Sequence, residues 1–139
     1  MIKKWQFKAT FSWKLKGAFT FVMKLDESNK INPYVIKSID YIKKNITNKI
    51  TINEVCNHIN LSKYYFSRVF KQQIGITPYK YILNCKIEGV KKDLKNGVDI
   101  NTVASNYGFY DLSHLNKNFI TVYGITPLEF QESCKARKK

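Results

Sequence analysis

The sequence predicts a mainly α-helical fold: two helix-turn-helix units, each similar to a homeodomain, joined by a long linker helix, with seven helices in all. From Asn32 onward, apolar residues recur every three or four positions, which is the spacing of one buried helix face. Residues that favour helix starts precede these apolar segments, and three of them are followed by proline. The two halves of this region also repeat each other.

The first unit is expected over residues 31–76 and contains three helices. Asn32 is a suitable N-cap for the first helix, and Pro33 fits its first turn. Thr51 and Glu54 have the spacing of a capping box, which opens the second helix. The buried stripe of the first helix is predicted to contain Val35, Ile36, Ile39 and Ile42.

The third helix, at residues 62–71, has two contrasting faces. Phe66, Val69 and Phe70 follow the spacing of one buried stripe, with Ser62 ahead of them as the N-cap. The opposite face is basic, aromatic and able to form hydrogen bonds, and carries Lys63, Tyr64, Ser67, Arg68 and Lys71. That combination is typical of a helix that reads a groove of DNA.

The linker helix is expected over residues 77–96, about five turns, with Thr77 as its cap. Its buried stripe is predicted to contain Tyr79, Leu83, Ile87, Val90 and Leu94. The second unit is expected over residues 97–134, with three helices that are capped by Asp99, Asp111 and Thr126.

The two units match each other at corresponding core and turn positions. Phe70 corresponds to Phe119 at an offset of 49 residues, as does the segment Gly75-Ile76-Thr77-Pro78 to residues 124–127. Upstream the offset is 48 residues, as between Leu61 and Phe109. The second unit is therefore a copy of the first with one extra residue in its turn.

Residues 1–30 follow a different pattern. Apolar and polar residues alternate from Trp5 to Leu15 and again from Phe19 to Leu25, which is typical of half-buried strands. We therefore expect a β-hairpin-like segment with one aromatic face, followed by a short linker. Residues 135–139 are expected to form a basic tail.

The formal net charge of +14 favours an anionic partner. Nucleic acid ranks first, an acidic protein second and a membrane surface third. From residue 32 to 134, however, 13 Lys and Arg stand against 8 Asp and Glu, which leaves the helical region at only +5. Charge alone therefore does not decide between these partners.

Other function classes find little support in the sequence. Cys56, Cys85 and Cys134 form no CxxC pair, which favours a reducing compartment, and neither they nor His58 and His114 have metal-ligand spacing. We expect no metal, no cofactor and no enzyme activity, because no nucleophile–base set or phosphate loop is present. The absence of a convincing signal peptide or membrane span leads us to expect a cytoplasmic protein without membrane contact.

About three quarters of the chain, from residue 32 to 134, resembles the DNA-binding region of bacterial AraC/XylS-family transcription regulators. The residues that carry the resemblance are Ser62, Arg68-Val69-Phe70-Lys71, Gly75, Thr77-Pro78, Val103-Ala104, Gly108-Phe109, Asp111, Ser113, Phe119, Gly124 and Thr126-Pro127. The resemblance implies a double helix-turn-helix domain over residues 31–134 that binds double-stranded promoter DNA. Its two recognition helices would enter successive major grooves, which are about 34 Å apart. An activator of transcription, with RNA polymerase as a second partner, is the role we expect.

By position, the resemblance also assigns the DNA contacts. The residues expected at base edges are Tyr64, Ser67 and Arg68 in the first recognition helix and Ser113, Asn116 and Lys117 in the second. Both sets lie opposite their buried stripes. Arg68 is suited to guanine, Asn116 to adenine and Tyr64 to a thymine methyl group. The residues expected at DNA phosphates are Lys49, Lys63 and Lys71.

Several positions depart from the family pattern. Ile120 stands where a lysine or arginine is usual, which removes an expected phosphate contact, and Leu115 replaces a phenylalanine. In the linker helix, Gly89 replaces the usual alanine, at a helix cost of roughly 1 kcal/mol, and Lys86 and Asp93 also depart. We therefore expect the first recognition helix to dominate DNA binding and the linker helix to be less rigid.

Longer members of the family carry a β-rich effector-binding domain before this region, and residues 1–30 are too few to form one. The chain is therefore expected to be a one-domain regulator or a truncated part of a longer one, with no small-molecule effector evident. The alternative function is a protein-interaction module that modulates a full-length regulator without reading DNA itself.

Overall fold

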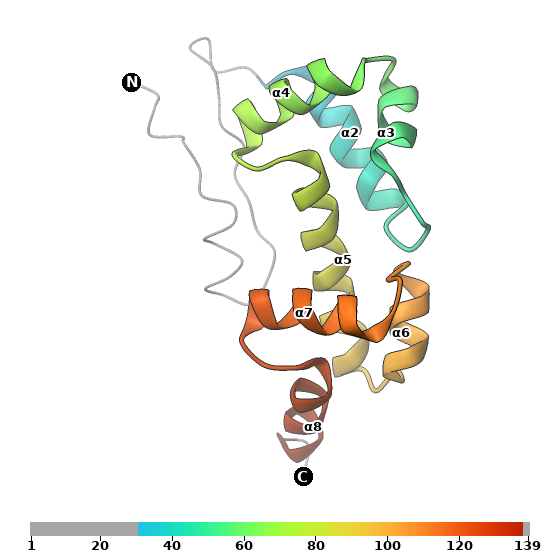
Figure 1. The fold of residues 1–139 in the computed structure, drawn as a ribbon, viewed down its shortest axis with the longest axis vertical. Coiled ribbons are helices and arrows are strands. Elements are labelled where there is room, and N and C mark those ends of the chain that lie inside the picture. The colour runs from blue at the N-terminus through green and yellow to red at the C-terminus, as the bar shows by residue number, and fades with distance from the viewer. Residues whose placement is uncertain (1–30, 138–139) are drawn as a thin grey trace.

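The computed structural model describes residues 31–137, which form seven helices and no strand (Figure 1). The helices are α2 (Pro33–Lys44), α3 (Ile52–Ile59), α4 (Lys63–Ile74), α5 (Pro78–Lys95), α6 (Ile100–Asn106), α7 (Leu112–Tyr123) and α8 (Pro127–Arg137). This architecture confirms the predicted mainly α-helical fold. The β-hairpin-like segment predicted at residues 1–30 lies outside the described residues.

The helices begin at the caps that the sequence indicates. Side-chain oxygens accept hydrogen bonds of 2.8–3.2 Å from first-turn amides at Asn32, Thr51, Ser62, Thr77, Asp99 and Asp111. Thr126 and Glu129 form a complete capping box, with reciprocal bonds of 2.8 and 3.1 Å. In the other predicted box, the Thr51 hydroxyl instead donates to Glu54 Oε2 at 3.2 Å, so only half of the box forms.

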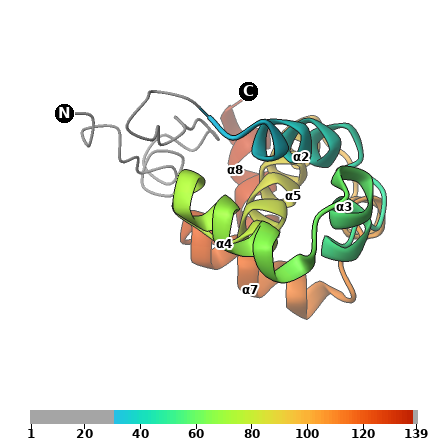
Figure 2. The same cartoon turned by 90° about the horizontal axis from the view of Figure 1, so that it is seen from above.

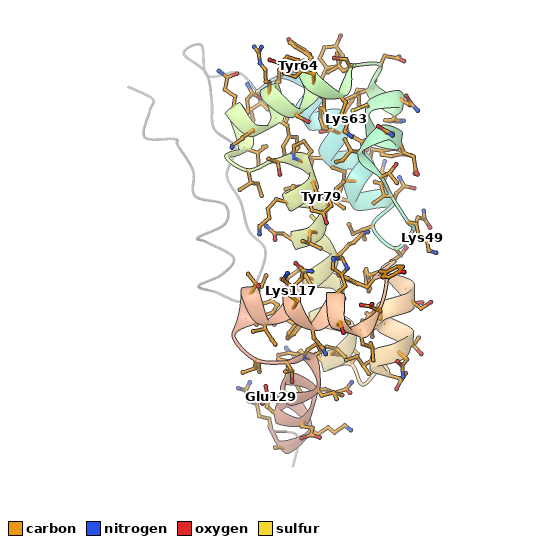
Figure 3. The ribbon with its side chains drawn as sticks, in the orientation of Figure 1. Lys49, Lys63, Tyr64, Tyr79, Lys117 and Glu129 are labelled. Atoms are coloured by element: carbon orange, nitrogen blue, oxygen red, sulfur yellow. The ribbon has the colours of Figure 1, made fainter. Side chains whose placement is uncertain are left out.

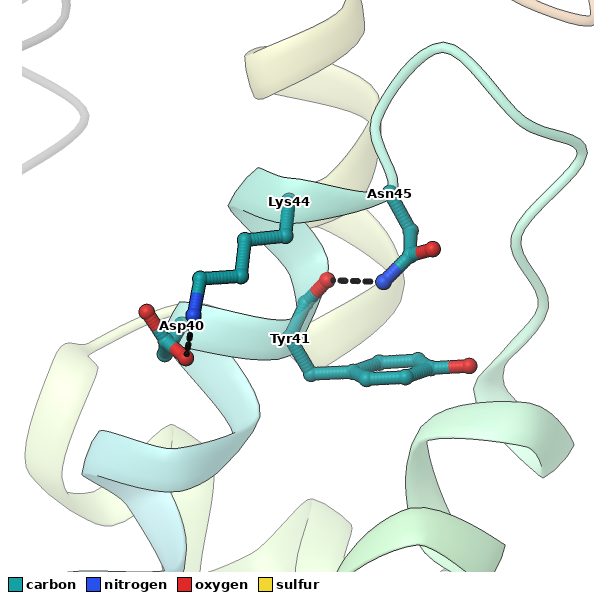
Figure 4. Close-up of polar contacts among 4 residues, drawn as sticks. All are labelled: Asp40, Tyr41, Lys44 and Asn45. Carbon is teal, nitrogen blue, oxygen red and sulfur yellow. Dashed lines mark hydrogen bonds and ion pairs between the residues drawn. The ribbon is translucent and has the colours of Figure 1, made fainter.

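Polar contacts close the last turn of α2 (Figure 4). Asn45 Nδ2 donates to the Tyr41 carbonyl oxygen at 2.8 Å, and the same oxygen accepts the Asn45 amide at 3.1 Å, so Asn45 binds this carbonyl twice. Asp40 and Lys44 form an exposed ion pair of 3.1 Å one turn apart. After α2 the chain forms a loop that contacts the second unit and then enters α3.

The core consists of two hydrophobic clusters that share α5. The first cluster is built by α2, α3, α4 and the start of α5, and its largest fully buried side chains include Phe66, Phe70, Ile42, Ile59 and Tyr81. The second is built by the rest of α5 with α6 and α7, and includes Ile87, Val90, Leu94, Leu115 and Phe119. Ile46, in the loop after α2, packs against both clusters.

Two residues predicted to be buried are exposed. Ile36 is 49% exposed, and the buried Ser38 takes its place, with its hydroxyl donating to the Val35 carbonyl oxygen at 2.7 Å. Tyr79 is 60% exposed, and α5 meets the first cluster through Tyr81 and Ile82 instead. Neighbouring helical residues point about 100° apart, so a run of apolar residues leaves the choice of face to the tertiary packing.

The internal repeat is also a repeat of packing. Phe70 meets Tyr81 edge to face with ring centroids 5.4 Å apart, and the corresponding pair in the second unit, Phe119 and Phe130, has centroids 5.8 Å apart. The two predicted recognition helices, α4 and α7, end alike at Gly75 and Gly124, whose φ angles of 98° and 82° lie in the left-handed region that favours glycine.

Gly89 makes room for a side chain of the second unit. A Cβ at this position would lie 2.5 Å from Tyr107 Cε1, and Tyr107 is only 6% exposed. Burial, together with the nearby Asp93 carboxylate that accepts its hydrogen bond, raises the pKa of Tyr107 to about 12. Gly89 and Asp93, two departures from the family pattern on α5, therefore both accommodate one buried tyrosine.

Gly89→Ala is expected to destabilise the fold, although alanine is the better helix former by about 1 kcal/mol. The added methyl group would overpack the Tyr107 ring, at a cost of roughly 1–3 kcal/mol. Urea unfolding measures the difference. In a Tyr107→Ala background, which empties the space, the same substitution should stabilise the protein instead. A parent protein made more stable by Gly89→Ala would contradict the close packing.

Candidate nucleic-acid interface

The two predicted recognition helices, α4 and α7, lie on the same face of the molecule. Figure 1 shows them at different heights along the long axis, joined by α5, and Figure 2 places both at the same edge when the molecule is seen from above. In both views the two helices run in the same direction from their N-termini. The 18 residues of α5 span about 27 Å at the rise of an α-helix. The fold therefore presents two similar helices on one face. The length of α5, which joins them, is of the same order as the distance between successive major grooves.

Helix α4 carries the side chains expected at base edges on its accessible side. Tyr64 is 72% exposed, Arg68 is exposed and Ser67 is half-buried. The Arg68 guanidinium carbon lies 5.6 Å from the centroid of the Tyr64 ring, a cation–π contact that holds both side chains together at the surface. With Lys71 they line a shallow depression that reaches the start of α5 at Thr77.

Helix α7 presents a less polar surface. Ser113 and Lys117 are exposed and Asn116 is half-buried, so these three predicted residues also share one side of their helix. One turn after Asn116, however, Ile120 is 42% exposed and offers no hydrogen bond or charge to the solvent. Lys117 is the one lysine or arginine in α7, whereas α4 carries Lys63, Arg68 and Lys71.

The three lysines predicted at phosphates are all exposed but occupy different places. Lys63 begins α4 and Lys71 is in its last turn. Lys49 lies in the loop between α2 and α3, away from α4 and beside the turn that leads into α7 (Figure 3). Its Cγ would be 3.3 Å from a Cβ on Gly108, so the stem of Lys49 packs against the turn of the second unit. The structure thus groups Lys63 and Lys71 with α4 and sets Lys49 apart at the contact between the units.

Two exposed tyrosines on this part of the molecule were missed by the sequence analysis. Tyr79, at the start of α5, lies between α4 and α7 (Figure 3). Tyr110, directly before the cap of α7, is 91% exposed. Leu61 corresponds to Phe109 and the cap Ser62 to the cap Asp111, so Tyr110 is the extra residue in the second turn. The change of the repeat offset from 48 to 49 residues indicated an extra residue in this turn, but it did not indicate that its side chain is exposed.

Within residues 31–137, no three His, Cys, Asp or Glu side chains are grouped closely enough to hold a metal ion. No helix of this part of the chain combines the length and the apolar character that a membrane crossing requires. The chemistry that α4 and α7 offer is hydrogen bonding, positive charge and aromatic contact.

Comparison with known proteins supports this view of the two helices. A family model described as "Helix-turn-helix domain" matches residues 55–133, more than half of the chain. The matched segment begins within α3 and ends within α8, and so contains both α4 and α7.

Similar curated proteins are regulators of transcription. "Probable transcriptional regulator LumQ" of Photobacterium leiognathi is 27% identical over 111 residues, which cover 79% of this chain and 45% of that protein. The "XylDLEGF operon transcriptional activator" of Pseudomonas putida is 26% identical over 111 residues, which cover 77% of this chain and 35% of that protein. The chain thus spans less than half the length of these relatives.

A solved structure with the same fold is the DNA-binding domain of AdpA, described as a global transcriptional factor in complex with a target DNA. It superposes with a TM-score of 0.70 over 74% of this chain and 94% of that one, at 16% sequence identity. At this identity the likeness establishes the fold.

Ser62→Ala is expected to lower the free energy of unfolding by roughly 1 kcal/mol, because the first turn of α4 loses the oxygen that accepts from the Tyr65 amide at 3.2 Å. Thermal or urea unfolding tests this effect. Ser105→Ala, an exposed serine inside α6, is the matched control and should leave stability nearly unchanged. Equal losses for the two variants would show that the cap does not stabilise α4.

Proposed function

The chain belongs to the AraC-type helix-turn-helix family, and we propose that it is a sequence-specific DNA-binding transcription regulator that places α4 and α7 in successive major grooves. The single observation that supports this most strongly is the position of the two helices on one face, in the same direction, with α5 between them (Figures 1 and 2). A monomer with this geometry meets two grooves on one side of the duplex without needing a second copy.

In this proposal α4 supplies most of the sequence discrimination. Arg68 hydrogen-bonds a guanine with its two-pronged guanidinium, and Tyr64 packs on a thymine methyl group beside it. The contact between these two side chains already orders them in the free protein, which lowers the entropy lost on binding. Ser67 completes the base-contacting set of α4, and Ser113, Asn116 and Lys117 read bases more weakly from α7.

Phosphate contacts fix the register of the protein on the duplex in this proposal. Lys63 and Lys71 flank the exposed side of α4 and suit the two strands that border its groove. Lys49 contacts a phosphate only if the duplex reaches the loop between α2 and α3, and its role is therefore separate from theirs.

We further propose that the protein acts in the cytoplasm, where bacterial DNA lies, and that it activates transcription through contact with RNA polymerase. One relative is named a transcriptional activator, which supports this direction of regulation. The DNA-binding proposal rests on the described helices α2–α8 alone.

The alternative is a protein-interaction module that does not read DNA. Exposed apolar side chains on the second unit favour it: Ile120, Ile125 and Leu128 are 42%, 37% and 53% exposed. Gel shifts with genomic fragments at several salt concentrations separate the two functions. Selective binding that weakens steeply with salt supports the regulator, and the absence of any selective shift supports the interaction module.

Arg68→Ala and Lys71→Ala should affect DNA binding differently. Using a site selected from a random DNA pool, we expect Arg68→Ala to cost roughly 1–3 kcal/mol of binding free energy and to relax preference at one base pair. Lys71→Ala should weaken selected and random DNA alike and reduce the salt slope by about 1.

Lys37→Ala is the control for both variants, because Lys37 is exposed on α2, a helix that carries none of the expected DNA contacts. It should bind like the parent. If Arg68→Ala and Lys71→Ala also bound selected and random DNA like the parent, α4 would not be a recognition helix.

Ile120→Lys should strengthen DNA binding. The substitution restores a positive charge to the exposed side of α7, and one added phosphate contact should steepen the salt dependence by a slope of about 0.9. Ile36→Lys makes the same chemical change at a similarly exposed isoleucine on α2. Fluorescence anisotropy at several salt concentrations should show a larger gain for Ile120→Lys, and equal gains would indicate an effect of net charge alone.

A further inference from the structure

A cavity of about 230 Å³ lies between the two helix-turn-helix units, against the side of α5. The first unit lines it with Ile52, the second with Phe109, and α5 with Ile82 and Leu83. Its walls are therefore mainly apolar and come from both units. An apolar cavity of roughly 150 Å³ is enough to hold a benzene molecule, so this one has room for an aromatic ring and a small substituent.

Two polar side chains, Lys86 and His114, also line this cavity. The Lys86 amine lies 3.8 Å from the place that a Cβ on Gly108 would take, which puts it under the turn before α7. Burial lowers the pKa of Lys86, because it removes water from the charged amine. Within residues 31–137, no carboxylate lies within ion-pair distance of this amine.

His114 is the second polar group. Its ring lies 5.4 Å from that of Phe109, measured between centroids, and its Nδ1 is buried without a hydrogen-bond partner among the described residues. A third polar residue of the wall, Thr51, is already engaged as the cap of α3. The cavity thus combines apolar walls with the half-buried amine of Lys86, which has no carboxylate partner among the described residues.

We propose that this cavity is a binding site for a small apolar carboxylate, which places its hydrocarbon part between the two units and its carboxylate on the Lys86 amine. Pockets of this kind bind through apolar walls and gain selectivity from a few polar groups. A partly desolvated amine without a counter-ion is unfavourable, and a ligand carboxylate would supply the missing partner in surroundings where charge pairing is strong. The proposal rests on the lining of this cavity and does not depend on DNA binding.

The probe is 2-naphthoate, with 2-naphthamide as a neutral molecule of nearly the same shape. Titration of the full chain, followed by ¹H–¹⁵N NMR and calorimetry, should show 2-naphthoate binding at least tenfold more tightly than 2-naphthamide. The shifted amides should cluster at residues 50–52, 79–86 and 108–114, which border the cavity. No saturable binding of 2-naphthoate, or shifts that map elsewhere, would overturn the proposal.

Two substitutions test the parts of the site separately. Lys86→Met removes the amine but keeps an unbranched side chain that is one atom shorter, and should abolish the preference for the acid, leaving the binding of 2-naphthamide unchanged. Leu83→Phe fills the cavity and should weaken both probes. Lys92→Met, at an exposed lysine of the same helix, is the control and should bind like the parent.

Folding of the variants is monitored by circular dichroism. Lys86→Met removes a partly buried, unpaired charge and is expected to fold at least as well as the parent. An unchanged preference for 2-naphthoate in folded Lys86→Met would show that the amine is not the carboxylate partner. The comparison of the two probes on the parent protein remains a test of its own, whatever the stability of the variants.

Discussion

Helix α5 contributes buried side chains to both hydrophobic clusters, and the positions of α4 and α7 depend on this sharing. Tyr81 and Ile82 pack into the first cluster, and Ile87, Val90 and Leu94 into the second, so one continuous helix contributes to both cores. Ile46 adds a second connection, because it touches both clusters from the loop after α2. The first unit thus packs on the start of α5 and the second on the rest of it. This packing sets the separation of α4 and α7.

The helical fold and its repeat were predictable because their causes are local. Caps such as Ser62 and Asp111 and the C-terminal glycines act within a few residues, so their patterns are visible in the sequence. The choice between neighbouring faces was not local, which is why Ile36 and Tyr79 were wrongly assigned to the core. The packing of Tyr107 against Gly89 joins residues that lie far apart in the sequence, so no local pattern could reveal it. From the family pattern alone, Gly89 had indicated only a less rigid α5.

The candidate interface was predictable only in part, for a related reason. The sequence identified which residues lie opposite the buried stripes of α4 and α7, and the structure places Tyr64, Arg68, Ser113 and Lys117 on the exposed surface. Their contacts with DNA stay predictions. The contact of Arg68 with Tyr64, the exposed Tyr110 and the cavity beside Lys86 arise from side-chain packing between positions that no motif links.

The spacing of the two half-sites on DNA tests the central claim most directly. A site selected from a random pool would be altered by inserting 5 or 10 base pairs between the segments that α4 and α7 read, and binding would be measured by anisotropy. Because α5 fixes the separation of the two helices, we expect both insertions to reduce affinity to that of the α4 half-site alone, although 10 base pairs restore the face of the duplex. Affinity that does not change with spacing would contradict a rigid two-groove reader.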